Sequence, residues 1–418
     1  MTVDRIKPAP ASCAPLAVAC VLACVSALSR QARLAAAPAG KTAGTVPSTQ
    51  CATAPGAMRL QQTACYDVYT DLDPELAPEA ALRLTTTARE YDRRTRGFSG
   101  DTPKRMAFYL FSRQEDYLAA GGVPGTNGVY YRDKLLAFAD PSQTDRLWRT
   151  LQHEGFHQFA DQAISRKLPP WVGEGLAEYF GEGIWTGDGF VTGLVRPVRL
   201  ARVKRMIADG QTMPFEQMIV MTAGRWSQRL APGDYDQAWA MVHFLIQAAD
   251  GKYTQSFAKF VKDVAGNRPW TMAFKLRFGG DVPALQDRYE HWWSSLGDDP
   301  TADRFTSARV ETLTSYLARA DGCGQRFASA EGFLLAARGG QLRADQRQGL
   351  PRSLLAGALE GAEDLGKWSL QVQGDSPALS LRTAEGQLFT GTFALEGSTV
   401  RQVEVRVTSG PAPGAPDR

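Results

Sequence analysis

Apolar and polar residues alternate in the first part of the chain and later recur at helical spacing. Alternation predicts strands at residues 66–69, 106–111 and 128–139, the last being a strand or a hairpin behind a glycine-rich loop. Helical spacing predicts helices over residues 78–94, 142–164 and 171–180. Pro170 suits the first position of the last helix, and Ser142 with Asp145 resembles a capping box that opens the preceding one. This mixture indicates the α+β class.

A turn-rich stretch, Gly297–Pro300, is interpreted as a domain boundary. Beyond it, helices are predicted over residues 302–320 and 350–359. Short alternating segments at residues 368–373, 378–382, 387–395 and 399–407 predict a small β-meander. We therefore expect a first domain over residues 65–297, a helical plus β-meander domain over residues 301–408 and a loose tail over residues 409–418. The second domain carries no chemical motif.

The amino terminus has the order of a secretory signal. Arg5 and Lys7 precede an apolar run from Ala14 to Leu28, which is shorter than the roughly 20 residues that span a bilayer. We assign residues 1–30 to a signal peptide or anchor and residues 31–64, rich in Ala, Gly, Pro, Thr and Ser, to a linker. The expected location is outside the cytoplasm of a bacterial cell, as a periplasmic, secreted, or lipid- or membrane-anchored protein.

The leader leaves two further alternatives open. One is a bacterial lipoprotein signal, which the residues Val21, Leu22 and Ala23 ahead of Cys24 resemble, with Cys24 as the lipidated residue. The other is an apolar leader without a targeting role. Cys51, Cys65 and Cys323 lie outside the leader. Either Cys51 and Cys65 close a small loop in an oxidising compartment, or all three thiols stay unpaired.

Composition narrows the class of protein without identifying it. Hydrophobic residues make up 44% and charged residues 22% of the 418 positions, which is typical of a globular protein. The net charge of +3 and the absence of long basic runs argue against a nucleic-acid partner. Only four histidines are present, and two of them fall within one five-residue window.

That window, His153-Glu154-Gly155-Phe156-His157, has the HExxH form on a predicted helix. Residues four apart share one helix face, so both imidazoles can reach one ion with Glu154 beside them. Glu174 and Glu178 on the next helix are also four apart, and their mutual repulsion favours a nearby cation. His153, His157 and Glu174 would supply the His2Glu set of a catalytic zinc, which leaves one position open.

At these residues the sequence resembles the gluzincins, zinc metallopeptidases that combine HExxH with a downstream Glu ligand. The match is closest to largely uncharacterised bacterial gluzincin-like domains with HEGxHQ and EGxAEYF patterns, here at residues 153–158 and 174–180. The resemblance covers about residues 66–296 and is specific only over residues 148–180. It implies a thermolysin-like domain with a mixed sheet and two metal-binding helices. The gap between the motifs is shorter than in the aminopeptidase branch, whose glycine-rich exopeptidase signature is also missing.

Carried over residue by residue, the resemblance makes His153, His157 and Glu174 the zinc ligands and Glu154 the general base. Glu178 becomes the acceptor that orients the His153 ring, a task that metal-bound imidazoles generally require of a carboxylate, carbonyl or water. Gluzincin-like enzymes also tend to use a Tyr or His from a later helix to stabilise the oxyanion, and Tyr235 is the candidate here.

Each assignment has an alternative in which the residue has no role in a site. His153 and His157 could be ordinary surface residues, Glu178 a solvated carboxylate and Tyr235 a packing residue. Two other groups of residues receive no site role: Glu182 is expected on a solvated face, and His243 and His291 are expected in the core or at an interface. The glycine-rich segment of residues 183–197 is either a flap over the cleft or a plain surface hairpin.

The sequence thus predicts an exported metallopeptidase that hydrolyses peptide bonds of a peptide or protein substrate through a Glu-activated, zinc-bound water. Membrane attachment is expected only through the amino terminus. A non-catalytic, zinc-containing envelope module that binds a peptide or glycan is the main alternative, and a metal-free scaffold is a weaker one. The intact Glu154 and the open ligand position favour the enzyme.

Overall fold

The fold is described from a computed structural model. It describes residues 58–74, 76–101, 105–131, 133–139, 144–229, 231–345, 348–373 and 376–409. The predicted leader, Cys51, the proposed cap Ser142 and most of the predicted tail lie outside these residues. Across the described ranges, no helix combines the length and the apolarity that a bilayer crossing requires.

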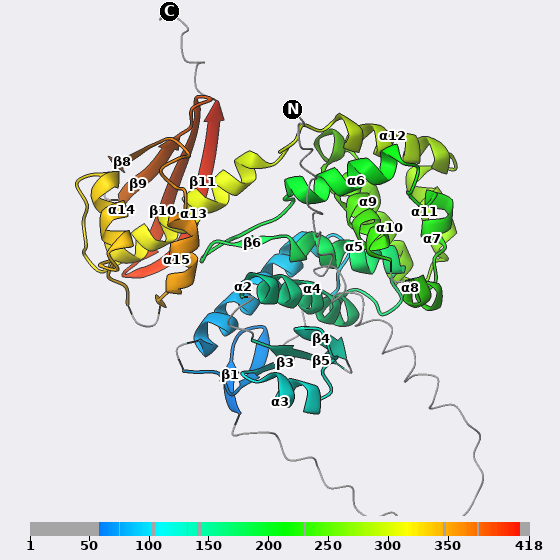
Figure 1. Ribbon diagram of the computed structural model, residues 1–418, viewed down its shortest axis with the longest axis horizontal. Coiled ribbons are helices and arrows are strands. Elements are labelled where there is room, and N and C mark those ends of the chain that lie inside the picture. The colour runs from blue at the N-terminus through cyan, green and yellow to red at the C-terminus, as the bar shows by residue number, and fades with distance from the viewer. Residues whose placement is uncertain are drawn as a thin grey trace, which may run out of the picture.

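A five-stranded mixed sheet forms the base of the molecule (Figure 1). Its order is β1-β2-β3-β5-β4, with β2, β3 and β5 parallel and the two outer strands antiparallel to their neighbours. The strands are β1 (Arg59–Gln62), β2 (Tyr66–Thr70), β3 (Met106–Phe111), β4 (Gly128–Tyr131) and β5 (Lys134–Phe138). The α+β class is therefore confirmed, and the segment 128–139 is a hairpin. The predicted linker was too long, because β1 lies inside it.

Alternation along the strands separates two apolar layers. Leu135 of β5 faces a core shared with α2 (Ala77–Thr95) and α4 (Thr144–Ala163), whereas Leu136 faces a smaller cluster with Tyr117 of α3 (Gln114–Ala119). Side chains on a strand point alternately to the two faces, so the sheet has α2 and α4 on one side and α3 on the other (Figure 1). The helix that bears the HExxH motif is thereby held on the sheet.

Eight further helices form a section beside the sheet, and α9 runs through its core. Buried aromatic side chains dominate this core, including Trp171, Trp239 and Trp293. The helices are α5 (Pro170–Gly181), α6 (Pro197–Ala208), α7 (Phe215–Ile219), α8 (Ala223–Arg229), α9 (Pro232–Gly251), α10 (Thr254–Ala265), α11 (Trp270–Phe278) and α12 (Val282–Ser295).

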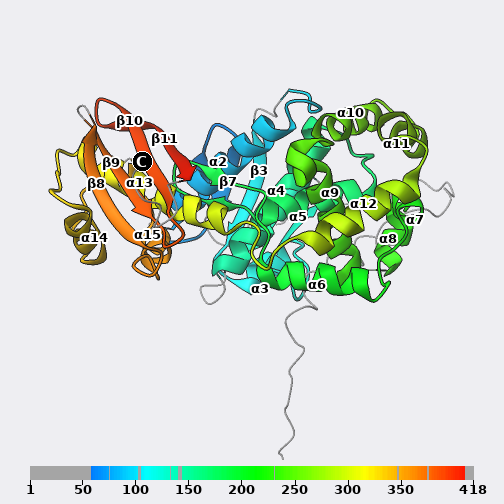
Figure 2. The ribbon, with the colours of Figure 1, turned by 90° about the horizontal axis from the view of Figure 1, so that it is seen from above.

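The carboxy-terminal section contains the predicted β-meander, with strand order β11-β10-β9-β8. The strands are β8 (Lys367–Gln373), β9 (Ser376–Arg382), β10 (Gln387–Glu396) and β11 (Thr399–Ser409). The long helix α13 (Ala302–Gly322) packs on it beside α14 (Ala330–Arg338) and α15 (Arg352–Leu359). This section lies at one end of the molecule and the helical section at the other, with the sheet between them (Figure 2).

Residues 183–197 include a two-stranded hairpin, β6 (Ile184–Trp185) and β7 (Phe190–Val191), which contacts α13. Arg319 of α13 holds Asp188 through two hydrogen bonds of 2.7 and 2.9 Å. The hydroxyl of Thr186 donates to the Glu311 carboxylate at 3.0 Å. The segment forms a hairpin, but it is not a surface hairpin: most of its residues are buried, and it is tied to the carboxy-terminal section.

The contact between Thr186 and Glu311 is expected to depend on pH. Burial raises the pKa of Glu311 to about 7 from 4.5, the Thr186 hydrogen bond opposes the shift, and Asp188 adds to it. Because the folded protein holds this proton more tightly than the unfolded chain, the contribution to stability is present below about pH 4.5 and is lost as the pH rises through about 7. Glu311→Gln should flatten this dependence and raise the free energy of unfolding at pH 8 by about 1–3 kcal/mol.

Urea unfolding at several pH values between 4 and 8 measures this effect. Glu385→Gln, at an exposed position of the same section, is the matched control and should follow the wild type. A Glu311→Gln curve that parallels the wild type at every pH would contradict the assignment.

Candidate metal centre

Helix α4 carries both imidazoles and is fixed on the sheet by buried neighbours of the motif. Phe156 and Phe159 are completely buried against α2 and α5, and Tyr91 of α2 packs edge-on against Phe156. The Gln158 side-chain amide donates to the backbone carbonyls of Ala107 (2.9 Å) and Asp133 (3.2 Å). These contacts fix the rotation of α4 about its axis. The side chains of His153 and His157 therefore project toward α5.

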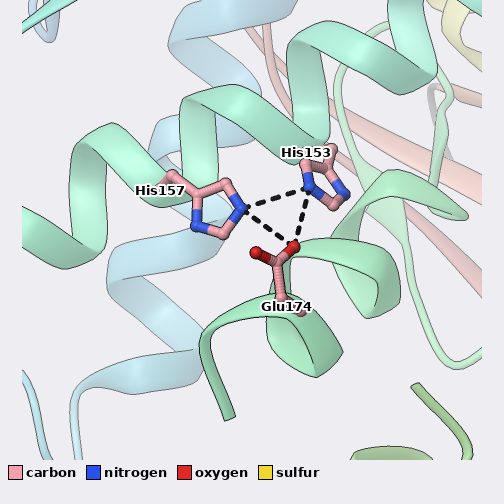
Figure 3. Close-up of side chains that lie close together, drawn as sticks. All are labelled: His153, His157 and Glu174. Carbon is pink, nitrogen blue, oxygen red and sulfur yellow. Dashed lines mark hydrogen bonds and ion pairs between the residues drawn. The ribbon is translucent and has the colours of Figure 1, made fainter. Parts of the chain in front are cut away.

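Helix α5 brings Glu174 to the two rings. Pro170 is its first residue, as predicted, and the Gln152 amide of α4 ties the end of α5 through the carbonyls of Phe180 (3.1 Å) and Gly183 (2.9 Å). The Glu174 Oε2 atom lies 3.4 Å from Nε2 of His153 and 3.4 Å from Nε2 of His157 (Figure 3). The two Nε2 atoms are 3.1 Å apart. Three donor atoms from two helices thus converge.

The spacing of these donors fits a tetrahedral zinc ion. Ligand bonds of roughly 2.0–2.1 Å at tetrahedral angles place neighbouring donor atoms about 3.3 Å apart. The distances of 3.1, 3.4 and 3.4 Å match this value, and the three residues form a group that could hold a metal. The His157 side chain keeps 24% of its surface exposed, which leaves an approach for water and substrate.

The imidazole rings of His153 and His157 keep the Glu174 carboxylate ionised. Burial alone would raise the pKa of Glu174, but His157 and His153 lower it to about 2 through charge and hydrogen bonding. The carboxylate is therefore ionised at neutral pH, as a metal ligand must be.

Behind His153 lies a chain of charged groups. Nδ1 of His153 is 3.2 Å from Oε1 of Glu178, and Oε2 of Glu178 accepts from Arg199 at 2.7 Å. Arg199 is almost completely buried, contacts Asp236 at 2.8 Å and lies over the Trp239 ring. Burial would raise the pKa of Glu178, and the charge of Arg199 instead lowers it. Glu178 thus stays ionised and can fix the His153 ring with Nε2 toward the metal position.

Glu182 was expected on a solvated face, and this prediction was wrong. Its side chain is buried and contacts Arg196 (2.6 Å), Arg199 (3.3 Å) and Arg149 (3.7 Å). Three arginines compensate the cost of burying the carboxylate, and Glu182 in turn helps to hold Arg199 against Glu178. Arg199 was not predicted from the sequence, although Glu174, Glu178 and Glu182 recur at four-residue spacing and indicate that cations lie against this face.

Glu154 points toward the edge of the sheet. Its Oε2 atom accepts a hydrogen bond of 3.0 Å from the backbone N–H of Tyr130 on the edge strand β4. The carboxylate is half-buried and fixed by one oxygen, which leaves the other oxygen available. The general base expected from the motif therefore has a defined position next to the ligands.

Tyr235 reaches the same region from α9. Its ring is buried against Trp226, and its hydroxyl is buried without a hydrogen-bond partner among the described residues. Burial raises the pKa of this hydroxyl and the charge of Glu174 raises it further, whereas the adjacent Trp226 side chain opposes the shift; Glu178 and Glu154 add to the rise to a smaller degree. The hydroxyl is thus a neutral, unused donor within the electrostatic field of the site.

Gly175 sets the distance between α5 and α9. A Cβ atom at this position would lie 2.5 Å from the backbone oxygen of Ala238 and 2.6 Å from Val242 Cγ2. Only glycine allows the two helices to approach this closely, and the approach brings Tyr235 toward Glu174.

Gly175→Ala is expected to destabilise the protein by about 1–3 kcal/mol, because the added methyl group overpacks a rigid contact with backbone. Gly173→Ala is the matched control on the same helix, since a Cβ there meets no atom within 4 Å. That control should be neutral or stabilising by up to about 1 kcal/mol through helix propensity. Chemical denaturation of the two variants measures the difference, and equal midpoints would contradict the close approach.

The remaining histidines lie apart from the donors. His243 is buried among Trp239, Trp293 and Tyr179, and burial lowers its pKa to about 3, so the core prediction is confirmed for it. His291 is exposed, so a core position was wrong for it. Cys65 and Cys323 are free thiols.

Comparison with known proteins adds one match. A family model described as "Protein of unknown function (DUF1570)" matches residues 148–271. No curated protein matches the chain. The matched stretch contains both histidines, the three glutamates at 154, 174 and 178, Arg199 and Tyr235. The chain is thus similar, over the stretch that holds the candidate centre, to a family whose description states no activity.

Proposed function

We propose that the protein is a zinc-dependent metallopeptidase of the gluzincin type, exported from the cell, with His153, His157 and Glu174 as the metal ligands. The observation that carries this proposal is the convergence of two Nε2 atoms and one carboxylate oxygen at 3.1 to 3.4 Å from one another. This donor set has two neutral nitrogens and one anionic oxygen, a combination that recurs in catalytic zinc sites. The HExxH spacing and the carboxylate of Glu154 beside the ligands support hydrolysis over a purely structural role.

When bound, a zinc ion supplies Lewis acidity, which polarises a carbonyl and lowers the pKa of water to about 7. The residues of the chain divide the remaining work. Glu154 accepts a proton from the attacking water at its free oxygen and returns it to the leaving amine. Glu178 accepts the Nδ1–H of His153 and keeps Nε2 free as a donor, while Arg199 keeps Glu178 ionised. These roles correspond to peptide-bond hydrolysis.

The Tyr235 hydroxyl is assigned to the oxyanion that develops on the attacked carbonyl. A buried hydroxyl that donates to no protein group can donate to a ligand instead. A phenol with a raised pKa stays protonated at neutral pH and can donate.

Tyr235→Phe separates this role from packing. We expect kcat to fall by about 100-fold to 1000-fold, as for other oxyanion donors, with little change in KM. Stability should change little, because the ring is kept and the hydroxyl interacts at most weakly with the Trp226 indole N–H. Steady-state kinetics with thermal unfolding measures both quantities, and an unchanged kcat would leave Tyr235 as a packing residue.

The proposed function is tested by metal quantification combined with a broad peptide-library digest, with and without a chelator. We expect one zinc ion per chain, cleavage of some peptides, and loss of cleavage on chelation followed by recovery when zinc is restored. Bound zinc without cleavage of any peptide would favour the non-catalytic binding module. A purified chain that takes up no metal would overturn the proposal.

A further inference from the structure

A second candidate site lies between the sheet section and the carboxy-terminal section. A cavity of about 500 Å³ is enclosed by α2, α4 and β6 on one side and by α13 and α15 on the other. Its volume falls within the range of roughly 300–1,000 Å³ that is typical of small-molecule sites. Residues from distant parts of the chain line it, so the cavity exists only in the folded molecule.

The lining of this cavity is strongly basic. Four arginines contribute to it, and its described lining residues include no aspartate or glutamate; the arginines are Arg83, Arg149, Arg196 and Arg309. Four guanidinium groups that face one small volume raise the local concentration of anions.

Carboxylates outside the lining pair with three of these arginines. Glu79 pairs with Arg83 at 3.0 Å, and Glu182 contacts Arg196 and Arg149. Glu182 also contacts the buried Arg199, so its charge is shared further. Arg309, which is half-buried, makes no hydrogen bond or ion pair with any other residue that the structure describes. The Arg309 guanidinium is therefore available to pair with an anion in the cavity, and charge-assisted hydrogen bonds of this kind are among the strong ones.

Aromatic rings also line the cavity, and two of the arginines are stacked on them. The Arg83 guanidinium lies 4.3 Å from the centre of the Trp148 ring and 4.5 Å from that of Trp185. Arg196 lies 5.6 Å from the centre of the Phe305 ring. Arginine stacked on aromatic rings has its polar edge directed outward and held in place, which suits recognition of carboxylate or phosphate oxygens.

The cavity is separate from the candidate metal centre. Trp148 and Gln152 are four residues apart on α4 and line the cavity from one face of that helix. His153 and His157 leave the same helix on another face, toward Glu174. A ligand in the cavity therefore contacts none of the three metal-binding side chains.

We propose that this cavity binds a small organic anion, in which a carboxylate or phosphate group contacts the arginines and a flat apolar body lies along the aromatic walls. Arg309 is the residue that the anion engages from the carboxy-terminal section, and Arg83, Arg149 and Arg196 engage it from the other side. Both sections contribute to the site, so a bound anion links them.

Isothermal titration calorimetry on the full chain tests this site with defined probes. Phenyl phosphate and phenylacetate represent the two anionic groups, inorganic phosphate lacks the apolar body, and benzyl alcohol lacks the charge. We expect at least one aromatic anion to bind, inorganic phosphate to bind more weakly and benzyl alcohol not to bind. Absence of binding by both aromatic anions, or equal affinity for inorganic phosphate, would overturn the proposal.

Two variants locate the binding event. Arg309→Gln should lower the affinity for the aromatic anion by about tenfold or more, because a charged hydrogen-bond partner is lost. Arg288→Gln, at an exposed position on α12, should bind as the wild type does. Gly357→Leu adds a side chain to the lining of the cavity. A Cβ at this position meets no atom within 4 Å, so we expect the fold to tolerate the substitution while the leucine fills the cavity.

Gly357→Leu should therefore abolish binding and preserve thermal stability. Anions that bind at the metal centre instead would be insensitive to both Arg309→Gln and Gly357→Leu, and that result would refute the cavity site. None of these measurements uses hydrolysis, so they are independent of the proposed peptidase activity.

Discussion

Glu154→Gln should abolish peptide hydrolysis while zinc stays bound. The amide cannot take up a proton from water, so we expect kcat to fall by about 100-fold to 10,000-fold, the contribution of a positioned general base. The glutamine oxygen can still accept the Tyr130 N–H, and none of the three metal-binding side chains is altered. Metal analysis by mass spectrometry and hydrolysis of a peptide found in the library digest measure the two properties on the same preparation.

The matched control is Glu216→Gln, an exposed carboxylate on α7. This substitution makes the same change of charge away from the site and should leave kcat unchanged. Retention of wild-type turnover by Glu154→Gln would remove Glu154 from the reaction, and loss of zinc from this variant would show a structural effect instead.

Glu174→Ala should remove both metal and activity. The carboxylate is the only anionic member of the donor set, and the two imidazoles alone are a weak site. Outer partners of metal ligands typically contribute 10-fold to 100-fold in affinity, so loss of a ligand itself should cost more than about 100-fold. Competition with a chromophoric chelator measures the zinc affinity.

Glu178→Gln provides a graded comparison for that measurement. It keeps the shape of the side chain but removes the charge that faces His153 and Arg199, and we expect a loss of zinc affinity of about 10-fold to 100-fold. If Glu174→Ala and Glu178→Gln lowered the zinc affinity equally, the division into a ligand and an orienting residue would be wrong.

The parts of the centre that depend on helix periodicity could be predicted from the sequence. His153 and His157 are brought to one face by their spacing alone, and Pro170 marks the start of the helix that carries Glu174. The structure places these three donors together, although residues 158–173 separate the two motifs. Local signals are sufficient here because both helices are short-range structures joined by a short connection.

The long-range partners could not be predicted in this way. Arg199 contacts Glu178 because α6 and α5 both pack on α9, and Tyr235 lies within the electrostatic field of Glu174 because Gly175 lets α9 approach α5. Such contacts depend on how helices pack, which a single sequence does not specify. The exposed His291 shows the same limit, since an apolar helical pattern indicates one buried face without assigning every residue to it.

The hairpin that follows α5 has a consequence for any attempt to isolate a minimal catalytic fragment. A truncation at the turn near residue 297 would remove three hydrogen-bond partners of this segment. Asp188 would lose Arg319, and Thr186 would lose Glu311. The Val195 N–H would lose its acceptor, the Thr301 hydroxyl. Polar groups that are now paired and partly buried would lose their partners next to the helix that carries Glu174. The carboxy-terminal section therefore supports the segment next to the helix that carries Glu174, and we expect an excised amino-terminal fragment to be less stable and to bind zinc more weakly than the intact chain.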